Sequence, residues 1–331
     1  MKESLKAACK ALIENRDMLK RQFRLESTYL YPVCANIFIS EGSVPDPERL
    51  KDCGRMIKES VGIFSNFRGN VKLPLICSLA SDKDPQGRWE RAQGYYAFFK
   101  EHFFRSEFLA LAAAMLAGTP DIDAGALAER ARSLYNRMKK EHFFLTGSED
   151  SVSALLLAQS TRDEDALIED METCYRLLRE RMPISDGLQT SAHVLALTEE
   201  EPEKKCARMM EIYDAISGLC GKYGKYHELP IIAGMSFLDL PAQTLAEEVS
   251  EVEQYLRAQK GYRTIFGFDR KTRLMHAAML VSTVNASGEA CELSGMIAQQ
   301  SSVLLAAIQQ AILCAIAACS AASGAAAAAG H

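Results

Sequence analysis

The strongest constraint on the fold of this chain is an internal repeat of about 40 residues. The pentapeptide Lys-Glu-His-Phe-Phe occurs at 100–104 and again at 140–144. Two further anchors, a tyrosine and a Leu-Ala pair that closes a short apolar run, return at nearly the same interval. The tyrosines are Tyr96, Tyr135, Tyr175, Tyr213 and Tyr255, and the pairs begin at Leu79, Leu116, Leu157 and Leu195. Such a chain is built from similar units stacked side by side.

Each repeat combines two segments of opposite character. The first is long and charged with apolar residues at helical spacing, as in AGALAERARSLYNRMKKEHFF at 124–144. The second is short and almost free of charge, as in FLALAAAMLAG at 108–118. A helix with one apolar stripe lies at a surface, whereas a helix that is apolar all round is buried. The sequence therefore predicts an all-α, two-layer array of about six antiparallel hairpins, arranged either as an α-solenoid or as a closed α/α ring.

Interruptions in the pattern divide the chain into three parts. Residues 1–48 are predicted to be an N-terminal capping helix and a linker, because prolines at 45 and 47 break the helical pattern there. Residues 49–284 hold the six hairpins, and residues 285–331 an apolar C-terminal helix with an alanine-rich tail. No charged residue follows Glu292. We expect this tail to be buried in the fold, with a membrane anchor as the alternative, because a membrane-spanning helix needs about 20 apolar residues and Gln309 and Gln310 interrupt the best window.

Composition restricts the function and the location. The net charge of -5 comes without any concentrated basic stretch, which argues against a nucleic-acid-binding surface. Ten cysteines without a CxxC motif indicate reduced, buried thiols. The first residues are charged and lack a continuous apolar run, so we expect no signal peptide and a cytoplasmic protein. We expect no metal and no other cofactor, because His102 and His142 lack the two further ligands of a zinc site.

Polar residues at the turns inside the hairpins are the candidates for a functional site, because these turns should share one rim. The candidate catalytic residues are Glu149 and Asp150, an acidic pair that begins an inner helix, and His193, which lies within an apolar inner helix. Their structural alternatives are acids that oppose a helix dipole and a core histidine with its hydrogen bonds satisfied. The predicted binding rim comprises Arg68, Arg105, Glu107, Glu149, Asp150, Gln189 and His227.

Three motifs carry a resemblance to a known family: KKEHFFLTGSED at 139–150, LQTSAHVLAL at 188–197 and IQQAI at 308–312. They resemble an uncharacterised bacterial family, found chiefly in Firmicutes, that is labelled only as a domain of unknown function. The resemblance implies a bacterial protein and transfers no catalytic residue.

The repeat architecture favours a helical-repeat interaction or scaffold protein whose partner is a protein, because such arrays present extended binding surfaces. The alternatives are an α/α-ring enzyme or small-molecule binder with a site at the rim of the inner helices, and a membrane-associated protein. Convergence of the rim residues on one pocket would favour the enzyme or binder.

Overall fold

The computed structural model describes residues 1–119, 122–263 and 267–286. In these ranges the regular structure is entirely helical, which confirms the all-α class. The helices are α1 (Glu3–Gln22), α2 (Leu30–Ser40), α3 (Pro47–Ser60), the short 3-10 helix η1 (Asn66–Arg68), α4 (Lys72–Ser81), α5 (Pro85–His102), α6 (Glu107–Leu116), α7 (Ala124–Glu141), α8 (Asp150–Leu157), α9 (Glu164–Arg179), α10 (Asp186–Leu195), α11 (Pro202–Cys220), α12 (Leu229–Met235), α13 (Ala242–Ala258) and α14 (Arg270–Ala286).

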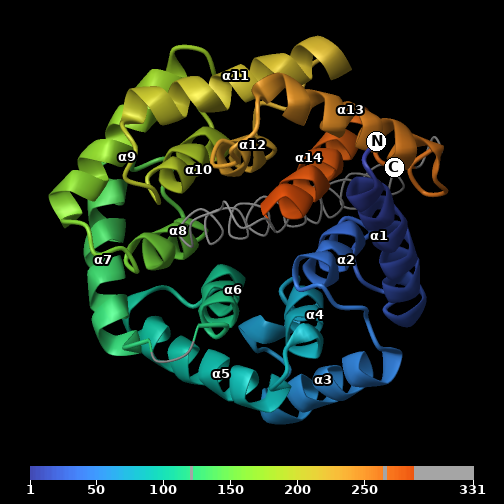
Figure 1. Cartoon of the computed structure of the whole chain (residues 1–331). Helices are drawn as coiled ribbons and strands as arrows, with labels where there is room; N and C mark the ends of the chain where they lie inside the picture. The colour runs from blue at the N-terminus through green and yellow to red at the C-terminus, as the bar shows by residue number, and fades with distance from the viewer. Residues whose placement is uncertain (120–121, 264–266, 287–331) are drawn as a thin grey trace, which may run out of the picture.

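The helices lie in two layers. Figure 1 shows the odd-numbered helices along the outside and the even-numbered helices inside them. Each outer helix packs against the inner helix that follows it in the chain. The outer helices expose their charged faces, whereas every residue of α8 and of α12 is buried. This division follows the contrast in charge between the two kinds of segment.

Aspartates at helix starts explain where the outer helices begin. The residue before each of α3, α5, α7 and α9 is an aspartate whose carboxylate accepts a hydrogen bond from a backbone N–H of the first helical turn; these residues are Asp46, Asp84, Asp123 and Asp163. A carboxylate at this position satisfies free donors and opposes the positive end of the helix dipole. Acidic residues therefore gather where the outer helices start.

The connections that run from an outer helix to the next inner helix form a surface that we call the outer-to-inner rim. It comprises residues 23–29, 61–71, 103–106, 142–149, 180–185, 221–228 and the described part of 259–269. These connections, with the first residues of the inner helices, contact one another in succession. The contacting pairs are Glu26 and Lys72, Asn70 and Glu107, Phe103 and Tyr135, Thr146 and Gln189, Gly187 and Tyr226, Gly221 and Arg270, and Phe268 and Tyr29. Tyr135 lies on α7 and binds the connection that follows it. The last pair returns to the first connection.

Two of the anchor tyrosines bind the connection that follows their own helix. The Tyr135 hydroxyl on α7 donates to the carbonyl of Gly147 at 3.1 Å, and the Tyr213 hydroxyl on α11 donates to the carbonyl of Tyr223 at 3.3 Å. The repeated tyrosine therefore fixes the path of the chain as it leaves the outer helix.

Helix α1 packs against α2, α13 and α14, so the N-terminal helices contact the last described ones. The buried Arg16 side chain donates to the Lys260 carbonyl at 3.0 Å and lies 5.1 Å from the centre of the Tyr262 ring. The Asn36 amide on α2 donates to the Thr283 hydroxyl on α14 at 2.9 Å. These polar contacts connect residues more than 200 positions apart in the chain.

The predicted N-terminal and C-terminal parts of the chain can be compared with the described helices. Residues 1–48, for which we predicted a capping helix and a linker, contain the two helices α1 and α2. Of the predicted apolar C-terminal helix and tail at 285–331, residues 285 and 286 end α14, and the rest, with its predicted burial, lies outside the described residues.

Arg16→Met tests whether the contact between α1 and the 259–269 connection stabilises the whole fold. The variant leaves the Lys260 carbonyl without its donor, and a hydrogen bond to a charged group contributes about 1.5 to 3 kcal/mol. We expect the free energy of unfolding in urea to fall by about that amount. Arg21→Met is the control, because Arg21 is exposed on the same helix and surface substitutions change stability by about 0.5 kcal/mol or less. Equal stabilities of the two variants would contradict the role given to Arg16.

Candidate functional site

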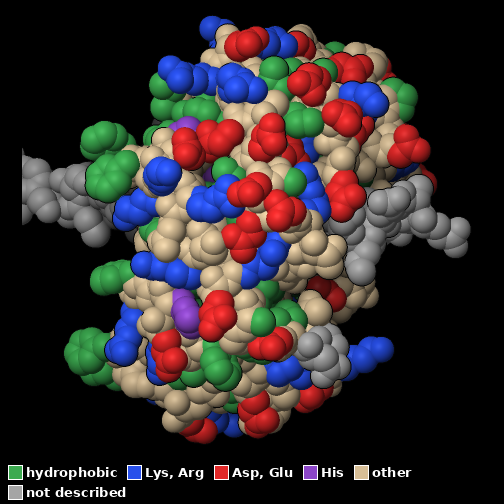
Figure 2. Space-filling model, turned by 90° about the vertical axis from the view of Figure 1, so that its left-hand side faces the viewer, with side chains coloured by type: hydrophobic (Ala, Val, Ile, Leu, Met, Phe, Trp, Pro, Cys, Tyr) green, Lys and Arg blue, Asp and Glu red, His purple; other side chains and the backbone are tan. Residues whose placement is uncertain are grey.

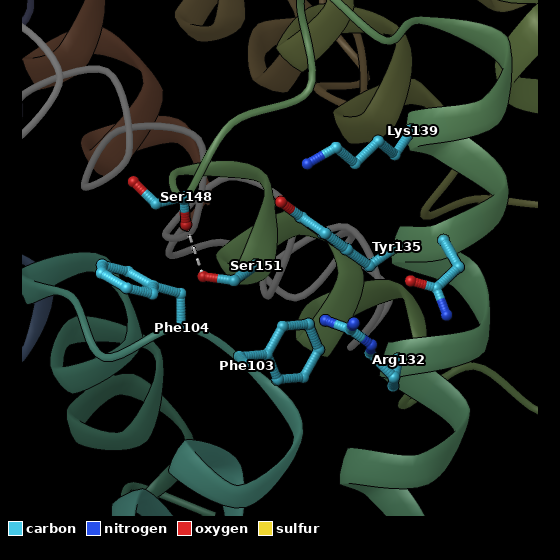
Figure 3. A pocket seen from close by; sticks show the side chains of 8 residues that line it. Phe103, Phe104, Arg132, Tyr135, Lys139, Ser148 and Ser151 are labelled. Atoms are coloured by element: carbon cyan, nitrogen blue, oxygen red, sulfur yellow. Dashed lines mark hydrogen bonds between the residues drawn. The ribbon is translucent and has the colours of Figure 1, made fainter.

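A pocket on the outer-to-inner rim lies between α7 and the connections that follow α5 and α7. Its volume is about 180 Å³. Figure 3 shows α7 side chains on one side of the pocket and the two phenylalanines of the 103–106 connection on the other. The lining residues are Phe103, Phe104, Arg132, Tyr135, Asn136, Lys139, Ser148 and Ser151.

One face of α7 supplies half of the pocket lining. Arg132, Tyr135, Asn136 and Lys139 are spaced by three or four residues, which places them on the same side of a helix. The Arg132 guanidinium lies 5.8 Å from the Phe103 ring centre and 5.7 Å from that of Tyr135. The Lys139 ammonium lies 6.0 Å from the ring centre of Tyr135 and 5.7 Å from that of Phe143, beside the pocket. Aromatic faces attract cations, so these rings hold both charges at the pocket.

The pocket has positive charge and no acidic lining residue, although the acidic pair Glu149 and Asp150 lies beside it. Among the described residues neither Arg132 nor Lys139 forms an ion pair. The Tyr135 and Ser151 hydroxyls on the same surface already donate to backbone carbonyls, of Gly147 at 3.1 Å and of Ser148 at 2.6 Å (Figure 3). Arg132 and Lys139 are the cationic donors left for a ligand, and proteins bind phosphate or carboxylate with such groups.

The acidic pair predicted as catalytic lies next to this pocket but does not line it. Asp150 is 3% exposed, and one of its carboxylate oxygens accepts a hydrogen bond from the Gly147 N–H at 2.9 Å. Its other oxygen lies 3.6 Å from Nδ1 of His193, which is 4% exposed. This distance is too long for a hydrogen bond, so the structure brings Asp150 and His193 together without pairing them. The Glu149 carboxylate folds over Gly147.

Burial shifts the pKa values of this acidic cluster. Burial, with the neighbouring Glu149 and Asp186 charges, raises the pKa of the Asp150 carboxyl well above its usual range. Burial also raises the pKa of Glu149, and it lowers the pKa of His193 to about 3. Shifts that disfavour the charged form of both an acid and an imidazole are typical of a desolvated cluster. Asp150 stabilises the turn at Gly147, and its burial separates it from the pocket.

The remaining predicted rim residues do not converge on one pocket. Three of them organise the connections: the Gln189 amide donates to the Thr146 hydroxyl at 3.1 Å, Glu107 accepts from the Asn70 N–H at 2.9 Å, and Arg68 donates to the carbonyls of Lys58 and Val61. The His227 ring lies 3.5 Å from the carboxylate of Glu228, and Arg105 is exposed. None of the predicted rim residues lines the pocket described above.

The sequence contained a signal for the pocket that the prediction did not use. The repeated Lys-Glu-His-Phe-Phe motif supplies Phe103 and Phe104 from its first copy, and Lys139 directly precedes the second copy. Tyr135 served only as a marker of the repeat. The pocket forms because the two copies lie side by side, which a comparison of adjacent repeats could have indicated.

A search for metal ligands finds no cluster in the described ranges: no three His, Cys, Asp or Glu side chains there lie close enough to hold an ion. His142 instead places Nε2 2.9 Å from the Glu172 carboxylate, and its ring packs against Tyr175 with centroids 4.3 Å apart. The contact connects the start of the 142–149 connection to α9.

The chain matches a known protein family. A family model described as "Protein of unknown function (DUF4003)" matches residues 15–312. The chain belongs to this family. The match confirms the resemblance carried by the motifs at 139–150 and 188–197, which form the α7–α8 connection and α10, while bacterial origin stays a prediction. No curated protein and no solved structure matches the chain.

Asp150→Asn tests the assignment of Asp150 as a buried neutral acid. Below about pH 4 the carboxyl is protonated in the folded and the unfolded chain, so the two proteins should differ little in pH dependence. As the pH rises toward the raised pKa, the unfolded wild type releases its proton and the folded one does not, so the wild type loses stability that the amide variant keeps. We expect the free energy of unfolding of Asp150→Asn, relative to wild type, to rise between pH 4 and pH 8.

The control for this experiment is Glu169→Gln, which neutralises an exposed carboxylate on α9. Its stability relative to wild type should stay constant over the same pH range. A constant difference for Asp150→Asn as well would show that Asp150 ionises normally in the folded protein.

Proposed function

We propose that this protein is a non-catalytic recognition protein that binds an anionic group, a phosphate or a carboxylate, in the pocket between Phe103 and Lys139. The site belongs to a closed α/α ring of seven hairpins, in which α1 and α2 add one hairpin to the six expected from the repeats. The contacts of α1 and α2 with α14 support the closed arrangement.

The observation that carries the proposal is the pair of cations at the pocket. The Arg132 and Lys139 charges lie about 6 Å from the centres of aromatic rings, and no acidic residue lines the pocket. Arginine binds carboxylate or phosphate through two parallel hydrogen bonds, and lysine adds a point charge. An anion that enters the pocket would therefore meet preformed donors.

The position of the predicted catalytic residues favours recognition over catalysis. Asp150 and His193 are almost completely buried and lie behind the connection that forms the pocket. A general acid or base must reach the proton that it transfers. The sequence-based expectations of a protein partner and a cytoplasmic location are retained in this proposal, with an acidic side chain or chain terminus as the group that a protein would offer.

Lys139→Gln tests the pocket as an anion site. Titration calorimetry at low salt would measure binding of inorganic phosphate, of acetate and of a short peptide with a C-terminal carboxylate. We expect wild type to bind at least one of these probes, and the variant to bind it about tenfold more weakly, because a hydrogen bond to a charged group contributes about 1.5 to 3 kcal/mol. The relative affinities of the probes distinguish a small anion from a protein carboxylate.

Lys140→Gln is the matched control. Lys140 is exposed and does not line the pocket. Its substitution removes one positive charge, as Lys139→Gln does. Its affinity for the probe should equal that of wild type. If both variants bind the probe equally weakly, the loss of affinity comes from general electrostatic attraction and not from the pocket. If wild type binds none of the probes, the proposal is refuted.

A further inference from the structure

Exposed apolar side chains occur in six successive connections of the outer-to-inner rim. Leu25 and Phe144 are almost fully exposed, at 100% and 98%, and Phe64 is 95% exposed. The set comprises Leu25, Ile63, Phe64, Phe104, Phe143, Phe144, Ile184 and Tyr226. These positions occupy the connections after α1, α3, α5, α7, α9 and α11. Each connection of the rim up to α12 therefore offers at least one large apolar side chain to the solvent.

The opposite surface lacks this feature. The connections from inner to outer helices, which we call the inner-to-outer rim, comprise residues 41–46, 82–84, 158–163, 196–201, 236–241 and the described part of 117–123. Among the described residues of this rim, Val44 is the one large apolar side chain whose exposure is comparable with that of the outer-to-inner rim. Scattered exposure of hydrophobic residues is normal, but here it gathers on one of two rims.

The two rims also differ in charge. The basic residues of the outer-to-inner rim are Arg24, Arg68, Arg105, Arg181, Lys222, Lys225, Lys260 and Arg263, and its acidic residues are Glu26, Glu149, Glu180, Glu228 and Asp269. In the inner-to-outer rim the basic residues are Lys83 and Arg162, against Glu41, Asp46, Asp82, Asp84, Asp123, Asp163, Glu199, Glu200, Glu201 and Asp239. In Figure 2 hydrophobic side chains project from one edge at several heights, with Lys and Arg side chains beside them.

Helix capping explains part of the charge difference and none of the apolar exposure. Acids at the starts of outer helices and bases at their ends stabilise helix dipoles, and outer helices start at the acidic rim. An exposed phenylalanine in a connection stabilises no helix end. Apolar tips with basic neighbours are the combination by which peripheral proteins bind anionic membrane surfaces.

We infer that the outer-to-inner rim docks face-on to an anionic lipid bilayer, with its apolar tips inserted among the lipid headgroups. The tips are distributed over consecutive connections around the molecule, so they suit a broad surface that accepts each side chain separately. A protein partner would instead need a continuous complementary surface of about 800 Å² on each side. Arg181 pairs with Asp214, and Arg68 donates to backbone carbonyls. The exposed basic residues of the rim that complement anionic lipid are Arg24, Arg105, Lys222, Lys225, Lys260 and Arg263, while the acidic rim faces away.

Membrane docking requires no transmembrane segment from the described helices. None of them combines the length and the apolar character that crossing a bilayer requires. The inference also does not depend on the anion-binding pocket, because Leu25, Phe64 and Phe144 do not line it. A protein docked in this way would hold the pocket close to the membrane surface.

The test is co-sedimentation of the full chain with vesicles at low salt. We expect wild type to bind vesicles of phosphatidylcholine and phosphatidylglycerol, and to bind vesicles of phosphatidylcholine alone much more weakly. The triple variant Leu25→Ser, Phe64→Ser, Phe144→Ser should lower the partition coefficient on anionic vesicles by about tenfold or more. Its circular dichroism spectrum and phosphate affinity should match those of wild type, which separates this inference from the pocket.

Leu25→Ser and Val44→Ser form a matched pair for the control, because each removes an exposed aliphatic side chain from a connection, one on each rim. Val44→Ser should bind vesicles as wild type does, and Leu25→Ser more weakly. Three outcomes would overturn the inference: wild type that stays in the supernatant, a triple variant that binds as wild type does, and a triple variant that converts a lipid-free dimer to a monomer. The last would identify the rim as an interface with a second copy.

Discussion

The structure depends on the burial of inner helices that have no polar side. All residues of α8 and of α12 are buried, although a single outer helix can cover only one side of each. Each buried apolar side chain contributes about 1.5 to 3 kcal/mol to folding, so neighbouring inner helices pack together to remove the remaining sides from water. The contact of α14 with α2 extends this packing from the last described helix to the first inner one. The packing of the last described helix against the first inner helix is therefore a consequence of hydrophobic coverage.

Close packing of inner helices has a cost at the connections, where backbone donors and acceptors must be satisfied away from water. Carboxylates meet this need: Glu107 accepts from Asn70, Asp150 from Gly147, and Glu228 from Tyr226. The acids that looked suited to catalysis are therefore occupied by the backbone. The side chains that remain available on this rim include cations and exposed apolar groups, and these groups support binding.

Two kinds of recognition meet on one rim because all outer helices end there. The pocket cations Arg132 and Lys139 both lie on α7, whereas the apolar tips are distributed over six connections. In the proposed functions, the pocket would select a charged group over a few ångströms, and the tips would provide separated contacts over the width of the molecule. A helix-end rim can carry both functions because its residues contribute little to the core.

The sequence by itself determined the helical class, the alternation of charged and apolar helices, and family membership, because periodicity and charge are local properties of the chain. The sequence also placed the predicted rim residues at the turns. Their roles depend on distances between residues far apart in the chain, and a local sequence pattern does not contain such distances. Only the tertiary structure placed Phe103 beside Arg132, buried Asp150 against His193, and joined Arg16 to the carbonyl of Lys260. These contacts link residues from about 30 to more than 200 positions apart, and they arise from packing, which depends on the shapes of all neighbouring helices at once.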